Sequence, residues 1–206
     1  MIGVRGLGAA LLYCLAGAGV GRIGIIDDDV VSESNLNRQF LFATADIGQE
    51  KALIAAQKLF ALNPHIQYET QCLRVTTQNA PALVADWDIV LLAVDSIETR
   101  LCVNRACCKA GIALVNGSVE GFLGIPQIAQ PGVTPCLECL YGAAGQESRT
   151  VPSLGAPVAI VSSLMADAAL KIVLGVKRFA LYILFSVAFA FLSGLLIDIV
   201  LWTSAG

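Results

Sequence analysis

Charged residues are scarce in this chain of 206 residues, at 14% of the total against about 25% in an average soluble domain. The 13 lysines and arginines do not outnumber the 16 acidic residues, so the sequence lacks the basic excess that nucleic acid attracts. Apolar residues make up 56%. This is more apolar surface than one soluble domain normally buries, so we expect a homodimer interface, a membrane contact or further sequence to cover the excess.

The chain also has a single histidine, His65, beside the expected helix end at Asn63 and Pro64, where capping or exposure suits it better than a role as a base. Seven cysteines, with no secretory signal ahead of them, predict reduced thiols and a cytoplasmic protein. Only Cys136 and Cys139 have metal-ligand spacing. No repeat or low-complexity linker divides the chain, so we expect one domain over residues 1–206.

Short apolar runs alternate with stretches of helical spacing, which predicts a Rossmann-like three-layer α/β/α fold with a mainly parallel sheet. Met1 and Ile2 are all that the sequence shows of the first strand, which such a sheet carries near its centre. The expected strands lie at 23–26, 66–75, 88–94, 112–115 and, as an interrupted edge, 121–130, and a turn is expected at Asn116 and Gly117. The expected helices lie at 9–18, 50–62, 79–86 and 158–174.

A glycine-rich segment precedes the first of these helices. Gly3, Gly6 and Gly8 suit a turn whose backbone N–H groups reach phosphates at a helix N-terminus. Asp27 follows the 23–26 strand and lies about twenty residues beyond this turn, which is the position that binds a ribose hydroxyl. Arg5 stands inside the turn, where it could either obstruct a nucleotide or add a cation.

Two cations and two amides follow Asp27, and they suit a triphosphate better than a nicotinamide. They are Asn35, Arg38, Gln39 and Lys51. Asp95 follows the 88–94 strand at its carboxyl end and therefore faces the same edge of the sheet as Asp27, where a carboxylate can hold magnesium. The alternative for Asp95 is that it caps the next helix.

The order of these blocks resembles the ThiF/MoeB/HesA adenylyltransferases, which are relatives of the ubiquitin-activating enzymes. The resemblance covers residues 3 to about 175 and is carried by GVRGLG at 3–8, IDDDVVSESNLNRQ at 26–39, DIGQEK at 46–51, AVDSIETR at 93–100 and PCLEC at 135–139. It implies ATP-dependent adenylation of the C-terminal Gly-Gly carboxylate of a small ubiquitin-like sulfur carrier, of the molybdopterin or thiamin type. Arg5 departs from the family pattern, which has a glycine there.

The resemblance also assigns roles. It implies that the three glycines cradle phosphates, Asp27 binds ribose, Asn35 and Gln39 orient the phosphates, and Asp95 holds magnesium. Arg38, Lys51 and Asp95 are then the expected catalytic residues, with ATP and Mg²⁺ as cofactors.

Two family features are incomplete in this sequence. Relatives complete a zinc site with a second CxxC pair, but no cysteine follows Cys139, so Cys136 and Cys139 form an incomplete zinc site. The crossover cysteine of relatives corresponds to Ser148, which is not a thiolate nucleophile, so we expect adenylation without a covalent thioester.

The tail and the activity leave alternatives open. Residues 179–197 lack charge over a length that could span a membrane, which would make the protein membrane-associated, whereas 193–198 resemble the last strand of the family. We favour the soluble alternative, with a family core at 1–175 and an apolar tail at 176–206. The other functions to be weighed are a catalytically inactive or truncated scaffold half, a Rossmann dehydrogenase and a tRNA-modifying ATP-dependent relative.

Overall fold

The computed structural model describes residues 1–142 and 153–176. The chain forms two compact units, residues 1–173 and 174–206, and every helix and strand named below belongs to the first. The expectations for Ser148, for a membrane span at 179–197 and for a last strand at 193–198 fall outside the described residues. They stay predictions, as does the assignment of the whole chain to one domain.

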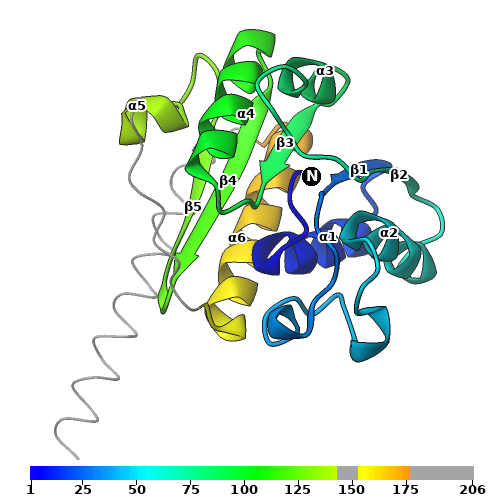
Figure 1. The fold of residues 1–206 in the computed structure, drawn as a ribbon. Coiled ribbons are helices and arrows are strands. Elements are labelled where there is room, and N and C mark those ends of the chain that lie inside the picture. The colour runs from blue at the N-terminus through cyan, green and yellow to red at the C-terminus, as the bar shows by residue number, and fades with distance from the viewer. Residues whose placement is uncertain (143–152, 177–206) are drawn as a thin grey trace, which may run out of the picture. The chain divides into compact units, whose positions relative to one another are not determined.

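The strands form a mainly parallel sheet, which confirms the predicted α/β fold (Figure 1). Strand β1 (Arg22–Ile26) pairs in parallel with β2 (Gln67–Gln71). Strand β3 (Ile89–Leu92) pairs in parallel with β4 (Ala113–Glu120), and β5 (Leu123–Ala129) runs antiparallel to β4 at the edge. Because Ile2 bridges in parallel to the ends of both β1 and β3, the carboxyl ends of these two strands lie at the same edge of the sheet.

Residues 1–3 join the two halves of this sheet. Ile2 forms parallel bridges to both Ile26 and Leu92. Its N–H donates to the Leu91 carbonyl at 2.8 Å, and its own carbonyl accepts from the Ala93 N–H at 2.9 Å. The two residues that the sequence analysis assigned to the first strand thus occupy the central strand position, between β1 and β3, with Ile2 only 4% exposed.

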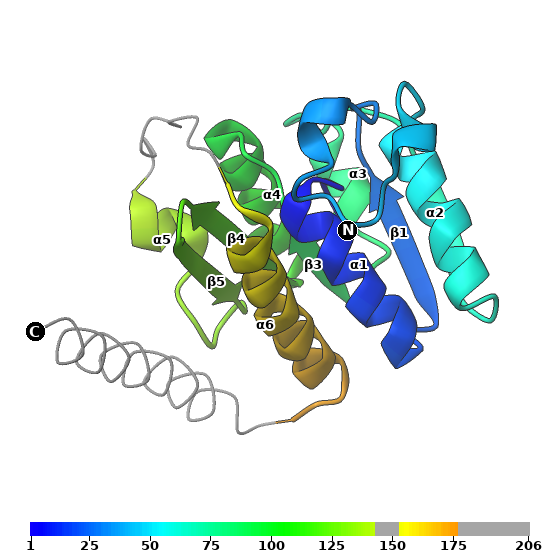
Figure 2. The same ribbon diagram turned by 90° about the horizontal axis from the view of Figure 1, so that it is seen from below.

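Helices cover both faces of the sheet, as the three-layer prediction requires. Helices α1 (Gly6–Ala18), α2 (Lys51–Leu62) and α6 (Gly155–Val173) form one layer, in which α1 packs against both of the others (Figures 1 and 2). Helices α3 (Ala80–Val84) and α4 (Ile97–Ala110) pack against each other in the other layer. Of the helices that the structure describes, α6 alone is long and apolar enough to cross a membrane, and it packs on α1 and β3 to β5.

Successive side chains of β3 point to opposite faces of the sheet and so contribute to the apolar core on each face. Val90 and Leu92 are buried in one apolar cluster with residues of α3 and α4, such as Val84 and Val103. Leu91, which is 5% exposed, points to the opposite face because successive strand residues alternate. The sheet is thus buried on both sides at its centre, as its continuous apolar runs predicted.

The turn that the sequence predicted at Asn116 and Gly117 is wrong, because β4 runs through both residues to Glu120. The amide of Asn116 bonds to Gln127 on β5 at 2.7 Å. Gly117 is needed for packing instead of turning, since a Cβ there would lie 2.3 Å from the sulfur of Met165 on α6. The chain reverses at Gly121, where φ is +58°. The structure also ends β2 at Gln71, earlier than predicted.

Candidate functional site

A cavity of about 640 Å³ opens at the carboxyl edge of the sheet. This volume lies within the range of about 300–1,000 Å³ that is usual for ligand pockets. Segments that follow β1 and β3 line it, together with the N-terminus of α1, the first residue of α2, and parts of α4 and β4. Its polar lining residues are Arg5, Asp29, Ser32, Asn35, Arg38, Gln39, Lys51, Asp95, Arg100, Ser118, Glu120, Tyr141 and Ser153.

Two of the three glycines that the sequence analysis assigned to the phosphate-binding turn allow the backbone before and at the start of α1 to pack closely. Gly3 has a φ of +88°, and a Cβ on it would lie 2.6 Å from the carbonyl oxygen of Ala93. A Cβ on Gly8 would lie 2.0 Å from the carbonyl oxygen of Gly3. Gly6 begins α1 and lines the cavity with Leu7, so the first free N–H groups of the helix lie at its wall.

Asp27 fastens this turn to the end of β1. Its carboxylate accepts N–H groups from Val4 at 2.5 Å and from Asp29 at 2.8 Å, and the residue is 6% exposed. Burial raises the pKa of Asp27, against the effect of these two hydrogen bonds. Asp27 is not among the described residues that line the cavity. Its role as the ribose ligand stays a prediction.

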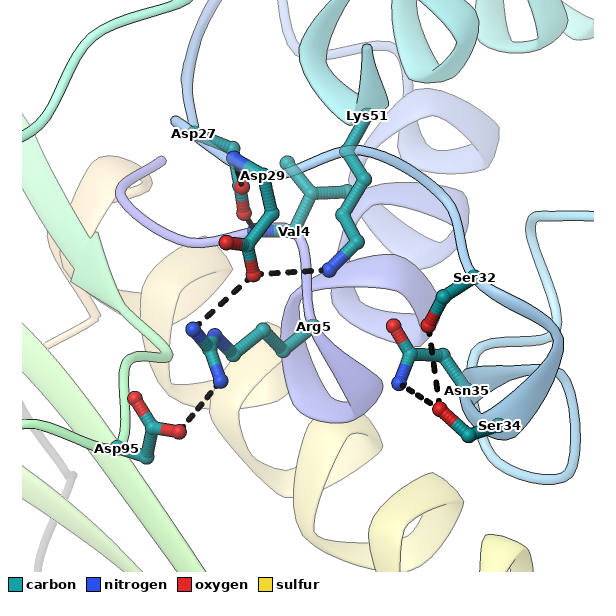
Figure 3. Close-up of polar contacts among 9 residues, drawn as sticks. All are labelled: Val4, Arg5, Asp27, Asp29, Ser32, Ser34, Asn35, Lys51 and Asp95. Atoms are coloured by element: carbon teal, nitrogen blue, oxygen red, sulfur yellow. Dashed lines mark hydrogen bonds and ion pairs between the residues drawn. The ribbon is translucent and has the colours of Figure 1, made fainter. Parts of the chain in front are cut away.

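Asp29 is the carboxylate of this segment that faces the cavity, and the sequence analysis missed it. Its Oδ2 accepts Nζ of Lys51 at 3.0 Å and pairs with a guanidinium nitrogen of Arg5 at 3.0 Å (Figure 3). Lys51 begins α2 and is only 2% exposed, so Asp29 and the cavity provide the polar surroundings of its charge. The sequence did not single out Asp29, because residues 27–29 lie beyond the end of β1 at Ile26, where strand alternation no longer decides which side chain faces the cavity.

Arg5 extends across the cavity from the start of α1. Its guanidinium lies between Asp29 and Asp95 and donates a hydrogen bond to the Asp95 carboxylate (Figure 3). The alternative role of Asp95 as a helix cap is wrong, since Ser96 caps α4 by accepting the Thr99 N–H at 3.3 Å. The side chain of Asp95 is 64% exposed, and its carboxylate oxygens fit magnesium, which prefers oxygen ligands.

Residues 34–39, with the sequence SNLNRQ, form another wall of the cavity. The first two of them belong to the short helix η1 (Glu33–Asn35). Arg38 donates to the Ser34 carbonyl at 3.0 Å and to Asn37 at 2.9 Å. Gln39 is 2% exposed, and its Oε1 has no hydrogen-bond partner among residues 1–142 and 153–176. A buried acceptor without a partner is costly, so this atom fits a ligand that offers a hydroxyl, an N–H or a metal-bound water.

Arg100 is a further lining residue to which the sequence analysis gave no role. It lies on α4, one turn beyond Asp95, and donates to Asn116 and to the Gly117 carbonyl, the latter at 2.9 Å. Burial lowers its pKa. Together with Arg5, Arg38 and Lys51 it faces the carboxylates of Asp29, Asp95 and Glu120, so four cations and three anions line the described part of the cavity.

The cysteine pair lies at the start of the short helix α5 (Leu137–Tyr141). The Cys136 and Cys139 sulfurs are 3.4 Å apart. Hydrogen bonds from the Cys139 backbone and the Asn104 side chain lower the pKa of Cys136 to about 7. The described residues form one cluster of three or more metal-ligand side chains, Asp27 to Asp29, and this pair is not part of it. Zinc binding therefore stays a prediction for an incomplete site.

Comparison with known proteins agrees with this geometry. The sequence profile of the ThiF family matches residues 1–191. The "Sulfur carrier protein adenylyltransferase" of Thermus thermophilus is 39% identical over 191 residues, and the match covers 86% of this chain and 69% of that protein. The "Sulfur carrier protein ThiS adenylyltransferase" of Escherichia coli is 36% identical, with 86% and 72% covered. The crystal structure of Escherichia coli MccB matches with a TM-score of 0.75 and 26% identity, over 83% of this chain but only 53% of that one.

Proposed function

The chain belongs to the ThiF family, and we propose that it adenylates the C-terminal Gly-Gly carboxylate of a small ubiquitin-like sulfur carrier with ATP. Two relatives named for the adenylation of sulfur carriers support this proposal. The structural observation that carries it is the cavity at the carboxyl edge of the sheet, where Arg38, the buried Lys51 and the exposed Asp95 line one space.

In this reaction a carboxylate oxygen of the carrier attacks the α-phosphorus of ATP. The bond from that phosphorus to the bridging oxygen breaks, and pyrophosphate leaves with the bonding electrons. The product is an acyl-adenylate. A protein contributes to such a transfer mainly by placing the two reactants and by balancing negative charge, so the charged groups of the cavity carry the mechanism.

Each predicted residue has a place in this scheme. Arg38 and Lys51 hold the phosphate chain, and Asn35 and Gln39 orient it from the η1 wall. The unpaired Oε1 of Gln39 accepts a ligand hydroxyl or a metal-bound water. Asp95 would hold a magnesium ion, which would supply positive charge to balance that of the phosphates. Asp27 remains the proposed ribose ligand, and its backbone contacts to Val4 and Asp29 make it rigid.

The finer features are also part of the proposal. The chain releases the acyl-adenylate without a covalent thioester, because serine occupies position 148. We place the protein in the cytoplasm as a homodimer. A gel without reducing agent tests the first point, since a thioester between enzyme and carrier would appear as a band that dithiothreitol removes.

The deciding experiment is carrier-dependent exchange of labelled pyrophosphate into ATP, with magnesium and a panel of carriers that end in Gly-Gly. We predict exchange by the unaltered chain and a loss of about 100-fold or more in Asp95→Ala, because charge stabilisation by one such group is worth about that much. Asp88→Ala is the matched control, since Asp88 is an exposed aspartate at the opposite end of β3.

Near-native exchange by Asp95→Ala at ordinary magnesium would remove Asp95 from the mechanism. Failure of the unaltered chain to bind ATP would favour the inactive scaffold, and binding of NAD in its place would favour the dehydrogenase. Exchange that depends on tRNA would favour the tRNA-modifying alternative.

A further inference from the structure

We propose that Arg5 changes partners when the nucleotide binds: it leaves Asp95 and becomes a ligand of the ATP phosphates, supplied by the chain's own glycine-rich turn. This inference rests on the proposed function, because it concerns the same cavity. It assigns a role to the residue with which this sequence departs from the family pattern.

The backbone at Arg5 accepts a side chain without strain. Its φ is −85°, whereas the left-handed conformation that glycine favours is used at Gly3, with a φ of +88°. Arg5 is the N-cap position of α1, and its side chain is 40% exposed toward the cavity. The arginine can therefore turn within the cavity by rotating its side chain, while the helix start stays in place.

The two carboxylates that hold Arg5 depend on it to different degrees. Asp29 has a second cation, because Nζ of Lys51 contacts the same Oδ2 atom at 3.0 Å. Asp95 has Arg5 as its only ion-pair partner in the described part of the chain. When Arg5 leaves, Asp29 keeps the buried Lys51, and Asp95 needs another cation.

The Asp95 carboxylate would hold a magnesium ion in the proposed reaction. Because Arg5 donates to that same carboxylate, a divalent ion there would repel the guanidinium. The phosphate chain that arrives with the ion offers the guanidinium new oxygen partners. Its planar fork of donors binds phosphate oxygens in pairs.

The position of Arg5 suits this exchange. Phosphates bind at helix N-termini, and Gly6 and Leu7 at the start of α1 line the cavity next to Arg5. A guanidinium there would join Arg38 and Lys51 around the phosphate chain. The opposite hypothesis is that Arg5 blocks the nucleotide, and it predicts an effect of opposite sign when the side chain is shortened or neutralised.

The test is equilibrium binding of ATP and of adenosine, with magnesium, to the unaltered chain, Arg5→Gln and Arg5→Lys. We expect Arg5→Gln to weaken ATP about tenfold, the value of one charge-assisted contact, and to change adenosine less than about twofold. Arg5→Lys restores part of the loss, since it keeps the charge but not the fork. The control is Arg22→Gln, which removes an arginine of similar exposure, 42%, that pairs with Glu69 outside the cavity.

A magnesium titration in the same assay tests the exchange itself. In Arg5→Gln no guanidinium competes with magnesium for Asp95. The magnesium concentration that gives half-maximal ATP binding should therefore be lower in Arg5→Gln than in the unaltered chain. An unchanged or higher requirement would contradict the exchange.

Equal or tighter ATP binding by Arg5→Gln would overturn the inference, and tighter binding would identify Arg5 as an obstruction. If the unaltered chain binds no ATP, the inference fails together with the proposed function. If ATP binds and depends on Arg5 but no carrier supports exchange, the proposed function fails alone.

Discussion

Gly8 shows at the scale of single residues how tightly the turn before α1 is built. A Cβ there would approach the Gly3 carbonyl oxygen to 2.0 Å, so backbone would have to move. A Cβ on Gly17, in the same helix, would meet no atom within 4 Å from the described residues outside its own helix backbone and chain neighbours. The two glycines have the same chemistry and opposite surroundings.

We predict that Gly8→Ala lowers the free energy of unfolding by about 1–3 kcal/mol, the usual cost of overpacking, and weakens ATP binding. Gly17→Ala should raise it by up to about 1 kcal/mol, because alanine favours a helix over glycine. Urea unfolding of both variants measures the contrast. Similar stabilities of the two would show that the turn relaxes without cost.

The aspartates of residues 27–29 show what a sequence can and cannot decide at this scale. Glycine spacing correctly predicted a carboxylate at this edge of the sheet. It did not decide which aspartate faces the cavity, because that depends on the path of the backbone after β1. Two N–H groups draw Asp27 inward and leave Asp29 at the cavity wall. Arg100 was missed for a related reason, since its carbonyl and amide partners lie on β4, distant in sequence.

Helices and strands were easier to predict from the sequence than their ends were. Apolar periodicity placed the helices α1, α2, α3 and α6 and the strands β1 and β3 close to their observed positions. The dipeptide Asn116–Gly117 is a local turn signal, but it lies within β4 because Asn116 bonds to Gln127 and Met165 packs closely against Gly117. At Asp95 the next residue, Ser96, took the capping role.

The short helix η2 (Thr44–Asp46) gives a prediction about pH at the scale of elements. Asp46 is 8% exposed, accepts the Ala43 N–H at 2.6 Å and pairs with Lys58. Burial alone would raise the pKa of Asp46, but the hydrogen bonds from Lys58 and Ala43 outweigh it and lower the pKa. A carboxylate whose pKa is lowered by folding stabilises the protein above the unfolded value, about 4, and loses this effect as the pH falls below it.

We therefore expect Asp46→Asn to lower the free energy of unfolding by about 1–3 kcal/mol at pH 7. The loss should become progressively smaller as the pH falls below about 4. Urea unfolding of both proteins from pH 7 to pH 3 measures the difference. Asp167→Asn is the control, because Asp167 forms an exposed pair with Lys171 one turn away on α6 and should change stability by less than about 0.5 kcal/mol. A difference that stays constant with pH would contradict the role of the Asp46 charge.

At the scale of the whole molecule, the sheet depends on residues 1–3. Ile2→Ala should lower the free energy of unfolding by about 2–5 kcal/mol, as is usual when a buried side chain is deleted. Ile2→Pro should lower it by a further ~1–3 kcal/mol, because proline also lacks the N–H that pairs with the Leu91 carbonyl. Urea unfolding and hydrogen exchange of the β1 and β3 amides measure both effects. Equal stability of the two variants would show that the backbone pairing of Ile2 contributes little.

The apolar excess of the sequence has a visible counterpart in the described residues. Phe122, just before β5, and Leu123, the first residue of β5, are 82% and 77% exposed. The homodimer and the membrane contact stay predictions that such side chains make worth testing. Composition could predict that some apolar surface stays exposed, but it could not predict where, because the exposure of each side chain depends on how the chain folds.

The central position of residues 1–3 also bears on how the protein is made. Ile2 leaves the ribosome before both of its neighbours in the sheet, and the second, around Leu92, emerges roughly ninety residues later. Contacts between such distant positions form late in folding, because a long loop must close first. During synthesis residues 1–3 must therefore wait for β3, and the cavity edge beside Asp95 forms only after β3 has been made.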